Sequence, residues 1–219
     1  MSVHLRREID KLKQSLLLLC RMVEDQVESA VKALLDRDQA LAERVAQRDD
    51  EIDQQEVEVE EECLRVLALY QPVAIDLRLI VSVLKINSDL ERVGDLAVNI
   101  AHKALAVVNE LQVAVPDVLP DMAAKTQSML HDSIDALVAL DSKLAAGVCA
   151  RDDEVDQLKR TIRLEVEDCI EINPRHLRPL LRLLAVSRNL ERIADSATNI
   201  AEDVIYMVDG RIIRHHEGE

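Results

Sequence analysis

The stretch "DLERVGDLAVNIA", Asp89–Ala101, returns one hundred residues later as "NLERIADSATNIA", Asn189–Ala201. Eight of the thirteen positions are identical, and each copy carries an acid followed four residues later by a second acid. Apolar residues recur in both copies every three to four positions, which is typical of an amphipathic helix. The chain therefore contains two related helices, and we expect an internal repeat around them.

Matching blocks on either side of the motif extend this repeat. "RDDEID", residues 48–53, returns as "RDDEVD", residues 151–156, and Pro72 is answered by Pro174. Because a proline disfavours helix in the residue before it, each half should contain a helix that ends at its proline and a further helix that follows. The expected helices span residues 5–34, 41–70, 77–110, 122–144, 152–172 and 177–208.

The predicted fold is all-α, with two tandem pseudo-symmetric three-helix bundles. We expect the first bundle over residues 1–111 and the second over residues 121–210. A linker with two prolines joins them at residues 112–120, and a flexible tail follows Gly210 at residues 211–219. Long helices with exposed apolar residues also favour self-association, and we expect a homodimer.

Composition and charge narrow the classes of partner. The chain has 42 acidic and 27 basic residues, a net charge of −15, which disfavours nucleic acid and anionic lipid as partners. No apolar run is long enough to span a bilayer, and no signal peptide is expected at the start. The cysteines form no CxxC pair and suggest buried free thiols in a reducing cytoplasm. They are Cys20, Cys63, Cys149 and Cys169.

The repeated acids of the first half should meet across a helical hairpin. Asp53 and Glu91 are equally far from Pro72 in the sequence, one before it and one after it, and the same is true of Asp49 and Asp95. In an antiparallel pair, residues equally far from the turn face each other, here roughly 30 Å from it. Glu91 and Asp95 should then lie in or beside the bundle seam, where burial and repulsion require compensation by arginine, protonation or metal.

The second half repeats this arrangement. Asp156 and Glu191 lie at almost equal distances along the chain on either side of Pro174, and so do Asp152 and Asp195. Each half thus has four carboxylates without histidine or thiol, an oxygen-only set that suits iron, manganese, magnesium or calcium. The alternative is that these acids are solvated and pair with arginines, and both interpretations stay open. The arginines in question are Arg48, Arg92, Arg151 and Arg192.

The repeated Asn99 and Asn199 lie four residues beyond Asp95 and Asp195 on the same helix faces. They are equally compatible with a role as oxygen ligands beside the acids and with ordinary hydrogen bonding within the bundle. The chain has no GxxxxGK[ST] motif and only four glycines, so we expect no phosphate-cradling loop, no organic cofactor and no enzymatic activity.

Two rival functions remain beside a regulatory adaptor. One is a ferritin-like di-iron carboxylate enzyme, but that chemistry draws on Glu-x-x-His, and none of the six histidines has a glutamate three residues before it. The other is a metal-free helical adaptor.

The sequence also resembles a known family. "DLRLIVSVLKINSDLERVGDLAVNIA", Asp76–Ala101, and "LERIADSATNIAEDV", Leu190–Val204, are similar to the two signature helices of PhoU-type phosphate-signalling regulators. The resemblance covers nearly the whole chain. It implies a cytoplasmic, all-helical negative regulator of the phosphate-starvation response and of phosphate uptake. Such proteins link the ATPase subunit of the phosphate ABC transporter to a membrane histidine kinase and its response regulator.

The resemblance also implies a metal site. Some family members bind multinuclear iron or zinc clusters through E(D)xxxD motifs, so iron, zinc or other divalent ions are the cofactors that it suggests. Carried over, the ligands are the acids that the hairpin register selects. One departure is His176, which stands where the first repeat has Asp76. The expected metal ligands are Asp49, Asp53, Glu91, Asp95, Asp152, Asp156, Glu191 and Asp195.

Overall fold

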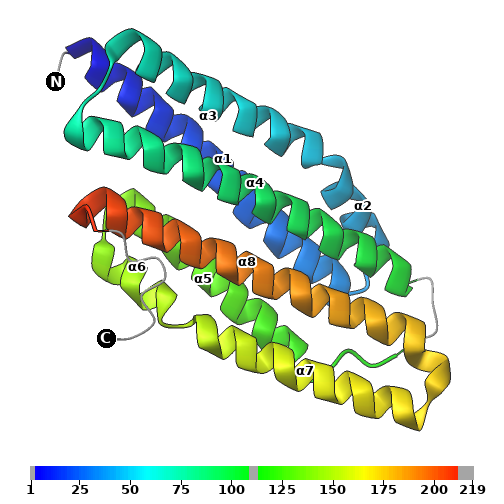
Figure 1. The fold of residues 1–219 in the computed structure, drawn as a ribbon. Helices are drawn as coiled ribbons and strands as arrows, with labels where there is room; N and C mark the ends of the chain where they lie inside the picture. The colour runs from blue at the N-terminus through cyan, green and yellow to red at the C-terminus, as the bar shows by residue number, and fades with distance from the viewer. Residues whose placement is uncertain (1–2, 109–112, 212–219) are drawn as a thin grey trace.

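The computed structural model describes residues 3–108 and 113–211 and contains helices without a strand in those ranges (Figure 1). It confirms the two tandem pseudo-symmetric bundles. The expected boundary at residues 111–112 and the tail from residue 212 onward lie outside the described residues. The helices are α1 (Val3–Leu35), α2 (Gln39–Gln47), α3 (Asp49–Tyr70), α4 (Ala74–Val108), α5 (Leu119–Ala139), α6 (Ser142–Cys149), α7 (Asp152–Ile172) and α8 (Leu177–Asp209), with a 3-10 turn, η1 (Pro174–His176).

The prediction of one continuous helix over residues 41–70 is wrong, because the structure has two helices there, α2 and α3, with a break at Arg48. Arg48 has φ −88° and ψ 0°, and its Nη1 lies 2.5 Å from Asp25 Oδ2 on α1. In the second bundle Arg151 has φ −98° and ψ −5°, and its Nη2 lies 2.5 Å from Asp132 Oδ2 on α5. The repeated arginine therefore joins each helix break to the first helix of its own bundle.

The helix expected at residues 122–144 is also shorter, because α5 ends at Ala139. Leu140 has a left-handed φ of 52°, and Asp141 caps α6 by accepting hydrogen bonds from the amides of Lys143 (2.9 Å) and Leu144 (3.1 Å). A side-chain oxygen at this position satisfies amides that have no partner within the helix. Asp38, the equivalent residue of the first repeat, caps α2 in the same way. Aliphatic periodicity that continues past Leu140 hides this turn in the sequence.

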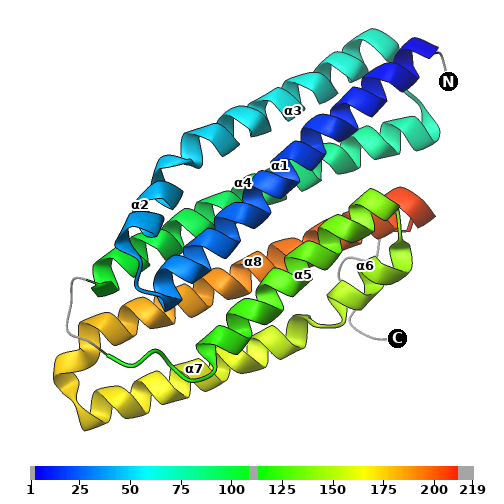
Figure 2. The ribbon, with the colours of Figure 1, turned by 180° about the vertical axis from the view of Figure 1, so that it is seen from behind.

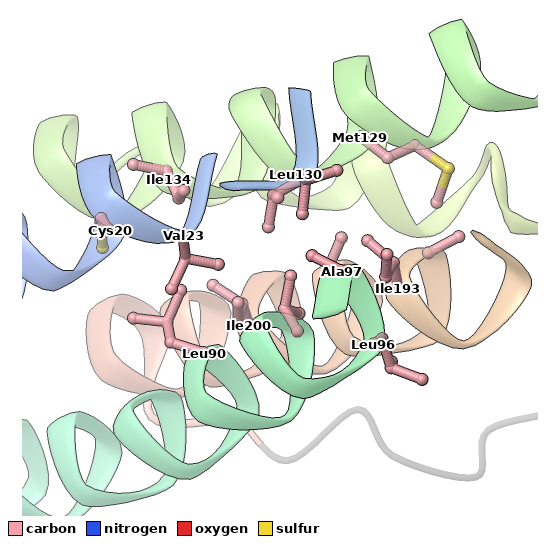
Figure 3. Close-up of a cluster of buried hydrophobic side chains, with 14 of the residues drawn as sticks. Cys20, Val23, Leu90, Leu96, Ala97, Met129, Leu130, Ile134, Ile193 and Ile200 are labelled. Atoms are coloured by element: carbon pink, nitrogen blue, oxygen red, sulfur yellow. The ribbon is translucent and has the colours of Figure 1, made fainter. Parts of the chain in front are cut away.

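The two bundles pack along α4 and α8, which lie side by side and antiparallel (Figure 1). Seen from behind, α1 and α5 meet across the same interface (Figure 2). The buried apolar residues form one cluster that includes members of both bundles (Figure 3). Each bundle thus covers an apolar face of the other. Among the described residues, no helix is both long and apolar enough to cross a membrane.

Candidate carboxylate cation sites

The hairpin of α3 and α4 positions the acids of the first repeat. α3 ends at Tyr70, Gln71 has a left-handed φ of 46°, and α4 then runs back along α3 (Figure 1). Ile52 and Val59 are buried, which fixes the rotation of α3 against the bundle core. As a result, the first turns of α3 lie beside the middle of α4, at the level where the hairpin register places the acids.

The four acids of the first repeat come within electrostatic range of one another. Loss of hydration raises the pKa of Glu91, and repulsion from Asp95 and from Asp53 across the hairpin raises it further. The pKa of Asp49 is raised first by burial and then by repulsion from Asp53 and Asp95. The structure thus brings together both pairs that the register predicts. The first turn of α3 also favours the charge of Asp49 through the helix dipole.

These acids lie beside the seam and not within it. Glu91 is half-buried and Asp95 is exposed, while Leu90, Val93 and Ala97 of α4 form the buried face. The seam lies there because α4 packs against α8 as well as α1 and α3, so its apolar face is turned toward all three helices. The carboxylates consequently form a cluster at the edge of the bundle that solvent can reach.

Sequence reasoning missed a fifth acid, Glu56, in the first cluster. Its side-chain Oε1 and backbone oxygen accept hydrogen bonds from Nδ2 of the buried Asn87, at 2.6 and 3.0 Å. Burial and repulsion from Glu60 and Asp53 raise the pKa of Glu56. Glu56 in turn contributes to the raised pKa of Glu91. The sequence signal was present, since Glu56 follows Asp49 by two helical turns on the same face.

The second repeat gathers its four acids in the same way. Partial loss of hydration at its carboxyl group raises the pKa of Asp195 to about 6, with further repulsion from Glu191, Asp152 and Asp156, although the residue lies at an exposed position. Burial and repulsion from Asp156 also raise the pKa of Asp152, whose Oδ1 accepts a hydrogen bond from Thr198 Oγ1 at 3.4 Å. The cross-hairpin relation predicted from Pro174 is therefore present here too.

The second cluster also contains a cation of its own, Lys159, which sequence reasoning missed. Its Nζ donates hydrogen bonds to Glu191 Oε1 at 2.6 Å and to Asp156 Oδ1 at 3.4 Å. One acid is on α7 and the other on α8, so the ammonium group bridges the hairpin. Lysine three residues after Asp156 is a weak signal by itself, because most such pairs are solvated.

Two other expectations are refined by the contacts. Arg48 and Arg151, considered as partners for the repeated acids, form their closest ion pairs with Asp25 and Asp132 on the first helix of each bundle. Asn199 Nδ2 donates to Asp89 Oδ1 at 3.3 Å. Asn199 therefore connects α8 with α4, which supports the interpretation as a bundle hydrogen bond.

Metal ligation by the eight acids stays a prediction. Within the described residues, no group of three or more His, Cys, Asp or Glu side chains has an arrangement that could hold an ion as it stands. The carboxylates would have to turn toward a common point, as mutually repelling groups do when a cation is added. The chemistry of the set fits a hard cation, because all its donors are oxygens, and Asp49 Oδ1 is buried and accepts no hydrogen bond in the described part of the chain.

Two helical bundles related by an internal repeat, each with an acidic hairpin, define a tandem-repeat helical protein. A family model described as the PhoU domain matches residues 16–104 and again residues 119–204. The two matches cover most of the chain, and the chain belongs to the PhoU family.

Named relatives agree with this assignment. The chain is 39% identical over 209 residues to a phosphate-specific transport system accessory protein PhoU homolog of Pseudomonas aeruginosa, covering 95% of this chain and 86% of that protein. The accessory protein PhoU of Escherichia coli is 32% identical over 212 residues, covering 97% and 88%.

Solved structures are also similar. The crystal structure of PhoU from Pseudomonas aeruginosa has a TM-score of 0.90 at 38% identity, covering 94% of this chain and 99% of that one. The phosphate transport system regulatory protein PhoU from Streptococcus pneumoniae has a TM-score of 0.89 at 30% identity, covering 95% and 99%.

Proposed function

We propose that this protein is a cytoplasmic, non-enzymatic negative regulator of the phosphate-starvation response and of phosphate uptake. It acts as an adaptor between the ATPase subunit of the phosphate ABC transporter and a membrane histidine kinase with its response regulator. The observation that carries the proposal is the match of both repeats to the PhoU domain. The names of the relatives, accessory and regulatory proteins of phosphate transport, support it.

The shape and charge of the molecule suit an adaptor. Its helices are long and lie side by side (Figure 1). α3 carries a dense series of acids outside its buried residues. Such a surface favours protein partners with basic segments and steers them electrostatically.

Divalent cation binding at the two carboxylate clusters is a second part of the proposal. Its support is the oxygen-only donor set, the cross-hairpin repulsion and the buried oxygen of Asp49 without a hydrogen bond. A bound cation would relieve this repulsion and join the two helices of each hairpin. Elemental analysis of the purified protein and of a variant with alanine at Glu91, Asp95, Glu191 and Asp195 tests this part. Equal and negligible metal in both proteins would favour a metal-free adaptor.

The regulatory role is tested in the host organism by deleting the gene and measuring alkaline phosphatase output in high phosphate. We expect output to rise severalfold on deletion and to return to its low level when the wild-type chain is supplied. Unchanged output after deletion would overturn the regulatory role, whatever metal the protein binds.

The four-alanine variant can be supplied to the same deletion strain to ask whether the clusters matter for signalling. A matched control replaces two acids of α7, Asp168 and Glu171, which are exposed and lie outside the clusters. We expect the control to restore repression. Oxygen uptake on addition of ferrous iron to the purified protein would instead favour the di-iron enzyme.

A further inference from the structure

One difference between the two carboxylate clusters exchanges an acid for a base at corresponding positions. The blocks at residues 48–53 and 151–156 align with an offset of 103, and this offset pairs Glu56 with Lys159. The buried residues of α3 and α7 keep the same offset, because Ile52 corresponds to Val155 and Val59 to Ile162. Glu56 and Lys159 therefore occupy equivalent places. Glu56 lies on the face of α3 that meets α4, and Lys159 lies on the face of α7 that meets α8.

The surroundings confirm that both side chains reach toward their cluster. Lys159 Nζ contacts Glu191 Oε1 at 2.6 Å and Asp156 Oδ1 at 3.4 Å. Glu56 interacts unfavourably with Glu91, the counterpart of Glu191, and its Oε1 accepts a hydrogen bond from Asn87 at 2.6 Å. One cluster thus has a fifth acid where the other has an ammonium group.

We propose that the two clusters differ in function. In the second cluster the ammonium of Lys159 already acts as the cation. An added divalent cation therefore binds only at the first cluster, which has Glu56 in place of this lysine. This inference rests on the cation binding proposed above and specifies which repeat performs it. The ammonium between Asp156 and Glu191 is an observed positive charge held by the carboxylates of one repeat. The first repeat has Glu56 in place of this lysine, so its carboxylates keep more negative charge for a cation from solution.

Electrostatic repulsion from Lys159 disfavours a divalent cation in the second cluster. A divalent cation entering the second cluster would be placed beside the Lys159 ammonium, or would have to displace it from two carboxylates. Repulsion between a divalent cation and an ammonium a few ångströms away, in a partly hydrated site, weakens binding of the divalent cation by roughly a hundredfold or more. The arginine beside the first cluster does not offset this difference, because Arg92 has an equivalent in Arg192. His102, which acts on Asp49, corresponds to Glu202, and this exchange acts in the opposite direction. The preference for the first cluster therefore rests on Lys159, whose ammonium contacts two carboxylates directly. Glu56 adds a further negative charge in the first cluster, which acts in the same direction.

The test uses Mn²⁺ as the probe and the full-length, metal-stripped protein. Titration calorimetry and electron paramagnetic resonance measure the number of Mn²⁺ ions bound, and circular dichroism checks that each variant is folded. We expect one strong site in the wild type. Paired substitutions Glu91→Gln with Asp95→Asn should abolish it. The matched pair Glu191→Gln with Asp195→Asn should leave it unchanged.

Reciprocal exchanges test the role of Lys159 directly. Lys159→Glu should create a second Mn²⁺ site, and Glu56→Lys should weaken the first by at least about a hundredfold. Lys143→Glu, an exposed lysine on α6, is the control for the same change in net charge and should leave one site.

The outcomes separate this inference from the proposal on which it depends. Two sites in the wild type, loss of the site in the Glu191/Asp195 variant, or a single site in Lys159→Glu would each overturn the inequivalence while cation binding remains. No Mn²⁺ binding by the wild type or by Lys159→Glu would overturn both.

Discussion

Several carboxyl groups in the clusters have raised pKa values, and Asp195 is the clearest case. Partial loss of hydration and repulsion from neighbouring acids raise its pKa to about 6 from the ordinary 3.8. The folded state therefore holds this proton more tightly than the unfolded chain does. Its contribution to stability is present at low pH and is lost as the pH rises through about 6.

Asp195→Asn removes this pH dependence. In chelator-treated buffer we expect the stability of the variant relative to wild type to increase as the pH rises from 4 to 7. The increase should be only about 0.5 kcal/mol, because solvent screens the exposed side chain. Urea unfolding at both pH values measures the change, and Asp168→Asn on the exposed face of α7 is the control. A difference that is the same at both pH values would contradict the prediction.

Gly94 allows α3 to lie close to α4 between Glu91 and Asp95. A Cβ at Gly94 would lie 3.2 Å from Ile52 Cγ2. At the equivalent positions the second repeat has Val155, which is smaller than Ile52, and Ala194, which is larger than Gly94. The two repeats thus reach similar packing by complementary changes in size.

This complementarity predicts coupling between the two positions. Gly94→Ala should add about 1 kcal/mol of stability in an Ile52→Val background, because alanine favours helix and the crowded methyl group is gone. In the wild type the crowding should cancel much of that gain. A double-mutant cycle by urea unfolding measures the coupling, and additive effects would show that the contact carries no strain.

At the scale of elements, short caps and breaks shape each bundle. Asp38 and Asp141 start α2 and α6 at equivalent points of the repeat, and each follows a residue with left-handed backbone. Arg48 and Arg151 then connect the break that follows to the first helix of the bundle. These contacts set the direction in which α3 and α7 begin, and thereby the place of Asp49 and Asp152.

Loss of the cap should therefore destabilise the protein. Asp141→Ala is expected to cost about 1 kcal/mol, because the amides of Lys143 and Leu144 lose their acceptor. Asp38→Ala should cost a similar amount. Thermal unfolding followed by circular dichroism measures both. Lys143→Ala, which keeps the cap, is the control, and an equal loss in that variant would argue against the capping role.

At the scale of the whole molecule, the two bundles share one apolar core. Cys20 and Val23 of α1 and Leu90 of α4 lie in the same cluster as Leu130 of α5 and Ile200 of α8 (Figure 3). The salt bridge between Lys85 Nζ and the buried Asp203 Oδ1, at 3.4 Å, crosses the same interface. A change in one bundle should consequently be felt in the other.

Leu130→Ala tests this coupling. We expect a loss of about 2–5 kcal/mol from the cavity, in a single unfolding transition for both bundles. Tyr70 lies in the first bundle, so tyrosine fluorescence reports that bundle alone once Tyr206 is replaced by phenylalanine. In a Tyr206→Phe background, Leu130→Ala should lower the unfolding midpoint seen by Tyr70 fluorescence as much as the midpoint seen by circular dichroism. An unshifted Tyr70 signal would show that the bundles unfold independently.

The repeat and its helices follow from local pattern. Apolar spacing, the prolines at 72 and 174 and the acids at matching distances from them depend on neighbours along one hairpin. For that reason the register correctly paired Asp53 with Glu91, and the two-bundle fold was predictable. The turn at Leu140 was missed because its aliphatic residues continue the helical spacing, whereas its counterpart at Asp38 lies in the expected gap between the helices at residues 5–34 and 41–70.

Contacts between distant segments could not be inferred in this way. The packing of α4 on α8 decides that Glu91 and Asp95 lie at the bundle edge, since the buried face of α4 depends on how many helices cover it. Likewise, Lys159 bridges two acids of different helices only because α7 and α8 place them within reach of one flexible side chain. Periodicity along the chain specifies the helices, whereas their rotation and side-chain conformations arise from packing all of them together.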